Sequence, residues 1–226
     1  NVLQEIIRFL LIIKAEDELR MNQLIADLKQ SEDVLPLASE EIVMLLIQHL
    51  NCKGASRLPV LIVASAYQTV KNQIGEVNKV LQAHNAADKQ TGSVGDVEIT
   101  LTNDDQIVTC YEMKDKRVTK TDIDIALQKL SKAKNKIDNY IFITTDIIEI
   151  EVTEYAKSLY EKTSVEFAVL DCIGFIRHFL HFFHRQRNMF LNIYQTMVLA
   201  EPTSSVSQPL KEAFLALRRA SEADRR

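Results

Sequence analysis

Apolar residues spaced three or four positions apart dominate much of this chain and predict several α-helices. Across residues 2–30, Ile6, Leu10 and Leu24 belong to such a series, which is the repeat of an amphipathic helix. Residues 201–209 read as a linker before a final helix. Further helices are expected over residues 39–50 with Ser39 as N-cap, 59–67 with Pro59 in the first turn, 152–162 and 173–187.

A different pattern occupies residues 95–114, which read GDVEITLTNDDQIVTCYEMK. Two runs of β-forming residues flank residues 103–105, whose Asn-Asp-Asp sequence is tolerant of turn geometry. The segment is therefore predicted to be a β-hairpin with a three-residue turn, in which Thr102 pairs with Gln106.

The register of this hairpin decides which side chains meet. Counting outward from the turn places Asp96 opposite Glu112, with Cβ atoms roughly 4.5–5.5 Å apart. Lys114 shares a face with Glu112, because strand side chains alternate between faces. Two acids and a lysine suit a divalent cation that activates water against a phosphodiester. A two-residue turn would shift the pairing and break the site. The simpler alternative is a solvated set of surface charges.

The segments beside the hairpin complete a small α/β unit. Thr121 is the expected N-cap of a following helix with Asp122 in its first turn. An apolar run over residues 139–145, NYIFITT, then predicts a buried strand. A helix is also expected before the hairpin, over residues 74–85, and it would carry Glu76.

This order of elements, with Asp followed by Glu-x-Lys, resembles the PD-(D/E)XK or restriction-endonuclease-like nuclease superfamily. The phrases HNAADKQTGSVGDVEI and YEMKDKRVT resemble SacI-like type II restriction enzymes over about residues 70–130. The resemblance implies that Asp96 and Glu112 ligate Mg²⁺, with Mn²⁺ as a substitute, and that Glu76 adds a carboxylate. Lys114 would orient the attacking water and stabilise the phosphate. Gly95 stands where many members have proline.

The composition allows a large core, but the net charge does not indicate nucleic-acid binding. The 226 residues are 46% hydrophobic, and the formal net charge is −4. A metal-dependent nuclease can still be acidic, because its catalytic face gathers carboxylates, and the charge that contacts DNA is then local. The candidate DNA-binding residues are Lys116, Arg117, Lys120, Lys132, Lys134, Arg185 and Arg187. A solvated helix cap is the alternative for the lysines.

The histidines and cysteines give weaker signals. His178, His181 and His184 lie three residues apart, and could bind a metal, contact DNA or a second subunit, or form an ordinary polar stripe. The three cysteines are widely spaced without a Cys-x-x-Cys motif, which fits a reducing cytoplasm better than a disulfide framework. The apolar run 9–13 is too short for a membrane span. Since the first residue is Asn1, natural sequence is expected to precede it.

Taken together, these patterns predict an α/β fold with a restriction-endonuclease-like core, a mixed central sheet flanked by helices, and a helical N-terminal subdomain. The expected division is residues 1–56 for that subdomain, 57–200 for the nuclease core, and 201–226 for a linker and C-terminal helix. The expected function is cleavage of double-stranded DNA by a homodimeric, cytoplasmic, Mg²⁺-dependent type II restriction enzyme. A repair or junction-resolving nuclease and a non-catalytic helical interaction module remain the alternatives.

Overall fold

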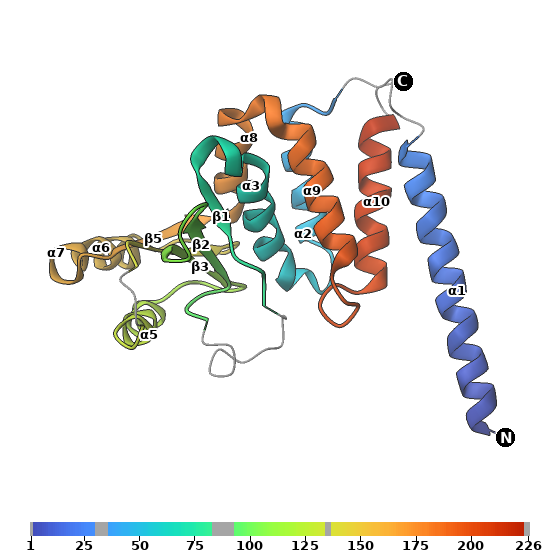
Figure 1. Ribbon diagram of the computed structural model, residues 1–226, viewed down its shortest axis with the longest axis horizontal. Helices are drawn as coiled ribbons and strands as arrows, with labels where there is room; N and C mark the ends of the chain where they lie inside the picture. The colour runs from blue at the N-terminus through green and yellow to red at the C-terminus, as the bar shows by residue number, and fades with distance from the viewer. Residues whose placement is uncertain (1, 30–35, 83–92, 134–136, 224–226) are drawn as a thin grey trace.

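A mixed five-stranded β-sheet stands at the centre of the computed structural model, which describes residues 2–29, 36–82, 93–133 and 137–223 (Figure 1). The strand order follows the chain, and the first three strands are antiparallel whereas the last three are parallel. Helices connect the parallel strands, as parallel pairing requires. The strands are β1 (Glu76–Asn78), β2 (Val97–Leu101), β3 (Ile107–Lys114), β4 (Asn139–Thr144) and β5 (Glu166–Asp171).

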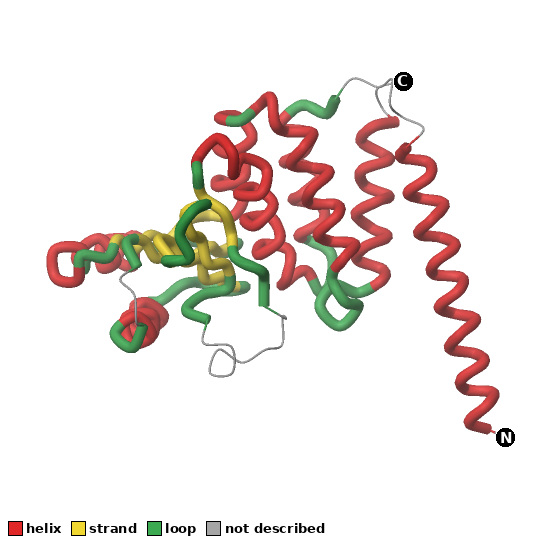
Figure 2. Tube along the Cα trace, in the orientation of Figure 1, coloured by secondary structure: helices red, strands yellow, loops and turns green. Residues whose placement is uncertain are grey.

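Helices cover both faces of this sheet (Figure 2). α3 and α8 lie on one side in Figure 1, and α5 lies on the other. The helices are α1 (Val2–Lys29), α2 (Ser39–Leu50), α3 (Leu58–Ile74), α5 (Lys120–Leu130), α6 (Ile150–Ser158), α7 (Tyr160–Thr163), α8 (Cys172–Phe182), α9 (Arg187–Ala200) and α10 (Gln208–Ala223). Short 3₁₀ turns span Ala55–Arg57 and His184–Gln186.

The alternation of side chains along β4 divides the interior into two cores. Ile141 and Ile143 face the larger core, which the sheet shares with α2, α3, α8, α9 and α10. Tyr140 and Phe142 face the smaller core, which includes Ile123 of α5 together with residues of α6. Every residue of NYIFIT after the first is buried. The predicted buried strand is therefore confirmed, and the reason for its continuous apolar run is that both of its faces are covered.

The helical region is tied together by a buried polar contact. His49 of α2 lies 3.0 Å from the hydroxyl of Tyr194 on α9 and 3.0 Å from the carbonyl oxygen of Leu210 on α10. Burial lowers the pKa of His49 to about 4. The imidazole is therefore neutral at neutral pH. Its Nε2–H donates to the carbonyl oxygen of Leu210, and its Nδ1 accepts from the hydroxyl of Tyr194.

α1 runs beside α10 at the edge of the molecule (Figure 1). Its second half packs against the larger core through Met21, Leu24 and Ile25. Its first half leaves large apolar side chains exposed, including Phe9 and Leu10. The helix predicted over residues 2–30 is thus confirmed as an element that packs along only part of its length.

Several sequence-based boundaries need correction. The helix expected over residues 74–85 is wrong, because α3 ends at Ile74 and Gly75 caps it in the left-handed region at φ 72°. The short strand β1 follows directly. α5 is capped by Thr119 rather than Thr121. The single helix expected over residues 173–187 ends at Phe182.

Candidate active site

The hairpin brings Asp96 beside the part of β3 that carries Glu112. The paired register ends at Val97 and Tyr111, and Asp96 precedes Val97 directly. The backbone N–H of Asp96 donates to the carbonyl of Tyr111 at 2.8 Å, whereas a residue directly opposite Glu112 would bond Glu112 itself or nothing on that strand. Asp96 therefore lies next to Glu112 without the regular one-to-one pairing that the sequence predicted.

The predicted turn is wrong, although the predicted register is right from Val97 to Ile99. Thr100 pairs with Ile107 instead of Val108, because the ladder shifts between Ile99 and Thr100. The connection between β2 and β3 therefore spans residues 102–106. A bulge adds one residue to a strand, and this shift offsets the longer turn before the pairing reaches Ile99. The site consequently does not require the three-residue turn.

The approach of the chain to Asp96 explains why glycine precedes it. A Cβ atom on Gly95 would lie 2.7 Å from the carbonyl oxygen of Tyr111. Any other residue, proline included, would collide with this strand backbone. The Asp96 carboxylate is exposed, and its Oδ2 accepts a hydrogen bond from the backbone N–H of Met113 at 2.7 Å. That bond fixes the side chain of Asp96 against β3.

Three side chains hold the carboxylate of Glu112. Its Oε1 lies 3.3 Å from Nζ of Lys114, while its Oε2 lies 3.4 Å from Nζ of Lys129. The hydroxyl of Tyr140 donates to the same Oε2 at 3.1 Å. Only 16% of the Glu112 side chain is exposed. Two positive charges and a hydroxyl therefore support this carboxylate in a partly buried position.

Lys114 bridges the hairpin and α5. Its Nζ lies 3.3 Å from Glu112 and 3.3 Å from Oδ1 of Asp122, which confirms that Glu112 and Lys114 share a face. Asp122 also accepts hydrogen bonds from the hydroxyl and backbone N–H of Thr119. Partial burial would raise the pKa of Asp122, but the bonds from Thr119 and the charge of Lys114 together lower it. This carboxylate therefore stays charged and holds Lys114 in place.

Lys129 and Tyr140 are site residues that the sequence analysis missed. Lys129 lies in the last turn of α5, where a lysine reads as a helix cap. Tyr140 belongs to an apolar strand, and its ring reads as core. The available signal was the alternation along β4, because Tyr140 pairs with Cys110 and so shares the face of Glu112.

The carboxylates of Asp96 and Glu112 fit a hard divalent cation. Both offer oxygen ligands from neighbouring chain segments, and Mg²⁺ commonly binds one or two carboxylates while it keeps several waters. Within the described residues, no three His, Cys, Asp or Glu side chains form a cluster suited to a metal ion. A cation bound here would take carboxylate oxygens from these two residues and its remaining ligands from other oxygen donors, such as water.

Glu76 does not join this pair. It opens β1 and pairs with Leu101, at the opposite end of β2 from Asp96. Five residues of strand separate these positions by roughly 17 Å, at about 3.4 Å per residue. The expected third ligand was placed on a helix that the structure replaces with a strand, and it is too far away to share an ion with Asp96.

The basic candidates nearest the site differ in their surroundings. Arg117 pairs with Glu149 at 2.5 Å, and Lys120 pairs with Glu151 at 3.4 Å. The side chain of Lys116 is exposed and has no ion-pair partner among the described residues. Lys132 is also exposed, just beyond α5, whereas Lys134 lies outside the described residues.

The two arginine candidates lie elsewhere. Arg185 is exposed in the turn between α8 and α9. Arg187 donates to the backbone carbonyls of Leu37 at 2.7 Å and His184 at 2.8 Å, so it anchors the chain before α2. α8 lies on the opposite side of the sheet from α5 (Figure 1). The structure does not bring these arginines to the carboxylate pair.

The histidine stripe does not converge either. Nε2 of His181 lies 2.8 Å from Glu40, while His178 stacks on Phe182 with ring centroids 6.1 Å apart. His184 belongs to the 3₁₀ turn after α8. The structure therefore gives the three rings separate surroundings.

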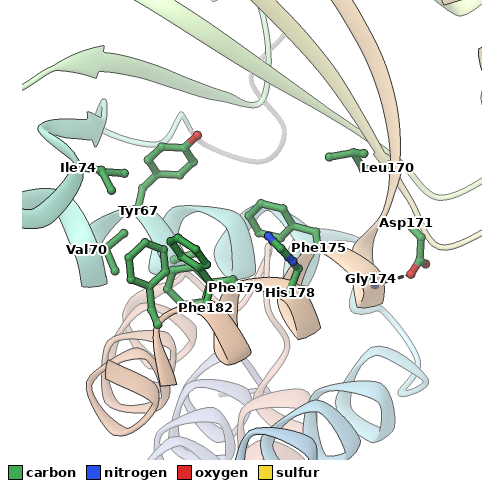
Figure 3. A pocket seen from close by; sticks show the side chains of 12 residues that line it. Tyr67, Val70, Ile74, Leu170, Asp171, Gly174, Phe175, His178, Phe179 and Phe182 are labelled. Atoms are coloured by element: carbon green, nitrogen blue, oxygen red, sulfur yellow. Dashed lines mark hydrogen bonds between the residues drawn. The ribbon is translucent and has the colours of Figure 1, made fainter. Parts of the chain in front are cut away.

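A cavity of about 450 Å³ opens on the other face of the sheet, between α3 and α8 (Figure 3). Apolar and aromatic side chains such as Phe175 and Phe179 form most of its lining. The hydroxyl of Tyr67 is engaged with that of Tyr111 at 2.9 Å, and the carboxylate of Asp171 accepts from the backbone of Gly174. The acids and lysines of the hairpin lie outside this cavity.

Similarity to known proteins covers the part of the chain that contains this site. Residues 38–145 match the SacI restriction endonuclease C-terminal domain. This SacI-like segment, residues 38–145, contains Asp96, Glu112 and Lys114, together with Lys129 and Tyr140. The match supports the expected resemblance to a restriction endonuclease family. No curated protein matches the chain. Among the described helices, none combines the length and apolar character needed to cross a membrane.

Proposed function

We propose that this chain is a restriction-type DNA endonuclease of the PD-(D/E)XK superfamily. The observation that carries the proposal is the placement of Asp96 against residues 111–113 of β3, beside Glu112 and its partner Lys114, inside the SacI-like segment. The mixed sheet with helices on both faces is compatible with a restriction-endonuclease-like core. Its substrate is double-stranded DNA, and its reaction is hydrolysis of phosphodiester bonds.

Each residue of the site has a distinct part in this chemistry. Asp96 and Glu112 would hold Mg²⁺, or Mn²⁺ in its place. The cation, when bound, lowers the pKa of a water molecule and offsets charge on the phosphate. The ammonium of Lys114 stabilises the charge that builds on the phosphate oxygens and hydrogen-bonds the attacking water. Asp122 keeps this ammonium directed toward Glu112.

The finer proposal is a sequence-specific type II enzyme that acts as a homodimer. One active site cuts one strand, so two strands of a symmetric site call for two active sites related by a two-fold axis. Discrete bands after digestion of a plasmid would support site specificity. A preference for branched DNA would instead indicate a junction-resolving nuclease.

The cation requirement gives the first test. Plasmid cleavage should appear with Mg²⁺ or Mn²⁺, and it should stop with EDTA. Ca²⁺ should not replace them, because it takes more ligands in a looser geometry. Gel electrophoresis of plasmid incubated with each cation measures this directly. Full activity in EDTA would refute the proposed mechanism, and an absence of cutting with every cation would favour a non-catalytic module.

Lys116 is the basic residue best placed to contact the DNA backbone. Replacement by alanine should flatten the dependence of log affinity on log salt concentration by about one unit, since each neutralised phosphate contributes about 0.9. Lys120→Ala should act in the same direction. Binding titrations at several salt concentrations measure the slope. Lys53→Ala, which changes an exposed lysine after α2, is the matched control. An unchanged slope in Lys116→Ala would leave that lysine as solvated surface.

A further inference from the structure

Tyr140 places a fixed hydroxyl beside Glu112. Its ring is fully buried, and it packs against Phe142 and Phe167 with ring centroids 5.3 and 5.7 Å apart. Contacts on the ring leave the hydroxyl little freedom. A donor held in this way can fix the orientation of a carboxylate more firmly than a long, partly exposed lysine can.

The same hydroxyl also reaches the segment that leads into Asp96. It lies 3.1 Å from the carbonyl oxygen of Val94 and 3.1 Å from Oε2 of Glu112. Because both oxygens are acceptors and the hydroxyl has one proton, this proton is shared between them as a three-centre hydrogen bond. Val94 is held from its other side, because its backbone N–H donates to Oε1 of Glu98 at 2.7 Å. The hydroxyl of Ser93 donates to that Glu98 oxygen at 2.9 Å. Tyr140 therefore touches both chain segments that carry the two carboxylates.

Charge distinguishes Tyr140 from the other donor to this oxygen. Lys129 brings a positive charge to within 3.4 Å of Oε2, and a positive charge there opposes a second cation. Tyr140 is neutral, since burial and the nearby charge of Glu112 raise the pKa of its hydroxyl. It can support Glu112 without competing electrostatically with a bound ion.

We propose that Tyr140 is a positioning residue whose hydroxyl holds Oε2 of Glu112 and the Val94 carbonyl in a fixed relation. Glu112 and Asp96 are thereby kept in the arrangement that binds a divalent cation. This assignment rests on the proposed function, and it extends that function to a residue of β4 outside the Asp and Glu-x-Lys pattern. The hydroxyl contacts ligand-bearing segments rather than the reacting atoms.

The test is cation binding measured apart from catalysis. Tyr140→Phe keeps the ring and removes the hydroxyl, and it should weaken Mn²⁺ binding about tenfold or more, as loss of a group that orients a metal ligand typically does. Isothermal titration calorimetry of the full chain gives the affinity. The Mg²⁺ concentration for half-maximal cleavage should rise in parallel, and added Mg²⁺ should restore much of the rate.

Two further variants sharpen the comparison. Tyr155→Phe removes a hydroxyl that bonds Asp124 on the outer surface of α5, and it should leave Mn²⁺ affinity unchanged. Lys129→Met removes the competing positive charge and should tighten Mn²⁺ binding. Weaker binding in Lys129→Met than in Tyr140→Phe would overturn the assignment, because Lys129 would then be the main support of Glu112.

The outcomes separate this assignment from the proposed function. Mn²⁺ binding that is lost in Asp96→Asn but unchanged in Tyr140→Phe would overturn the positioning role alone. The positioning role would also be overturned if Tyr140→Phe lost the circular dichroism signal of the folded protein at 25 °C, because Tyr140 would then be purely structural. No Mn²⁺ binding by the unmodified protein, or equal binding by Asp96→Asn, would refute the metal site itself and the positioning role with it.

Discussion

Replacing Lys114 with alanine should slow DNA cleavage by about 10²–10³, as the loss of one electrostatic group in a transition state typically does. In the proposed mechanism Lys114 acts where charge builds on the phosphate, so its loss should affect the chemical step far more than DNA binding. Single-turnover cleavage and gel-shift affinity, measured on the same duplex, separate the two effects.

The surroundings of Lys114 also define its controls. Without Lys114, Glu112 still has Lys129 and Tyr140 as partners, and Asp122 still has Thr119, so Lys114→Ala should remain folded. Lys157→Ala, at the exposed end of α6, should cleave at the unmodified rate. Near-normal cleavage by Lys114→Ala would refute the Glu-x-Lys interpretation. Unfolding of this variant would assign Lys114 a structural role instead.

Asp96→Asn should reduce cleavage at least as severely, because it weakens the cation site itself. The side-chain carbonyl of asparagine can still accept the hydrogen bond from Met113 that Asp96 accepts at 2.7 Å. The hairpin should therefore keep its register while the negative charge is lost. DNA affinity should be retained or increased, since a carboxylate that would face phosphate in the proposed complex has been removed.

Calorimetry with Mn²⁺ and single-turnover cleavage measure the two consequences of Asp96→Asn. Asp105→Asn makes the same chemical change at the exposed turn of the hairpin, and both properties should be unchanged there. Normal cation affinity and cleavage in Asp96→Asn would exclude Asp96 as a ligand. Loss of both in Asp105→Asn would indicate that the hairpin is sensitive to any such change.

The sequence was sufficient to predict that Asp96 and Glu112 lie close together but not what supports them. The pairing of Val97 with Tyr111 follows from strand periodicity within one short hairpin, so the local pattern was enough to bring the neighbouring acids together. The bulge near Thr100 could not be predicted, because two turn lengths fit the same residues. The bulge did not change the predicted pairing of residues 97–99, because the longer turn and the ladder shift offset each other before Ile99.

The errors elsewhere have equally specific causes. β1 has only three residues, too few for a periodic signal, and a helical pattern from α3 was extended across it. Gly75 at the α3 C-terminus was the one available marker of that boundary. Lys129 and Tyr140 reach Glu112 through the tertiary packing of α5 and β4, which no local spacing encodes. The residues that complete the site were therefore the ones least visible in the sequence.

The change from antiparallel to parallel pairing at β3 also bears on how the site assembles during folding. β2 and β3 are joined by a short connection, so the contact of Asp96 with β3 closes a small loop. Tyr140 is 28 residues from Glu112, and β4 can pair with β3 only after the chain has crossed over through α5. Contacts between distant residues carry a larger entropic cost and form more slowly. The acidic pair can thus meet early in a hairpin, whereas a fully supported Glu112 exists only in the completed sheet.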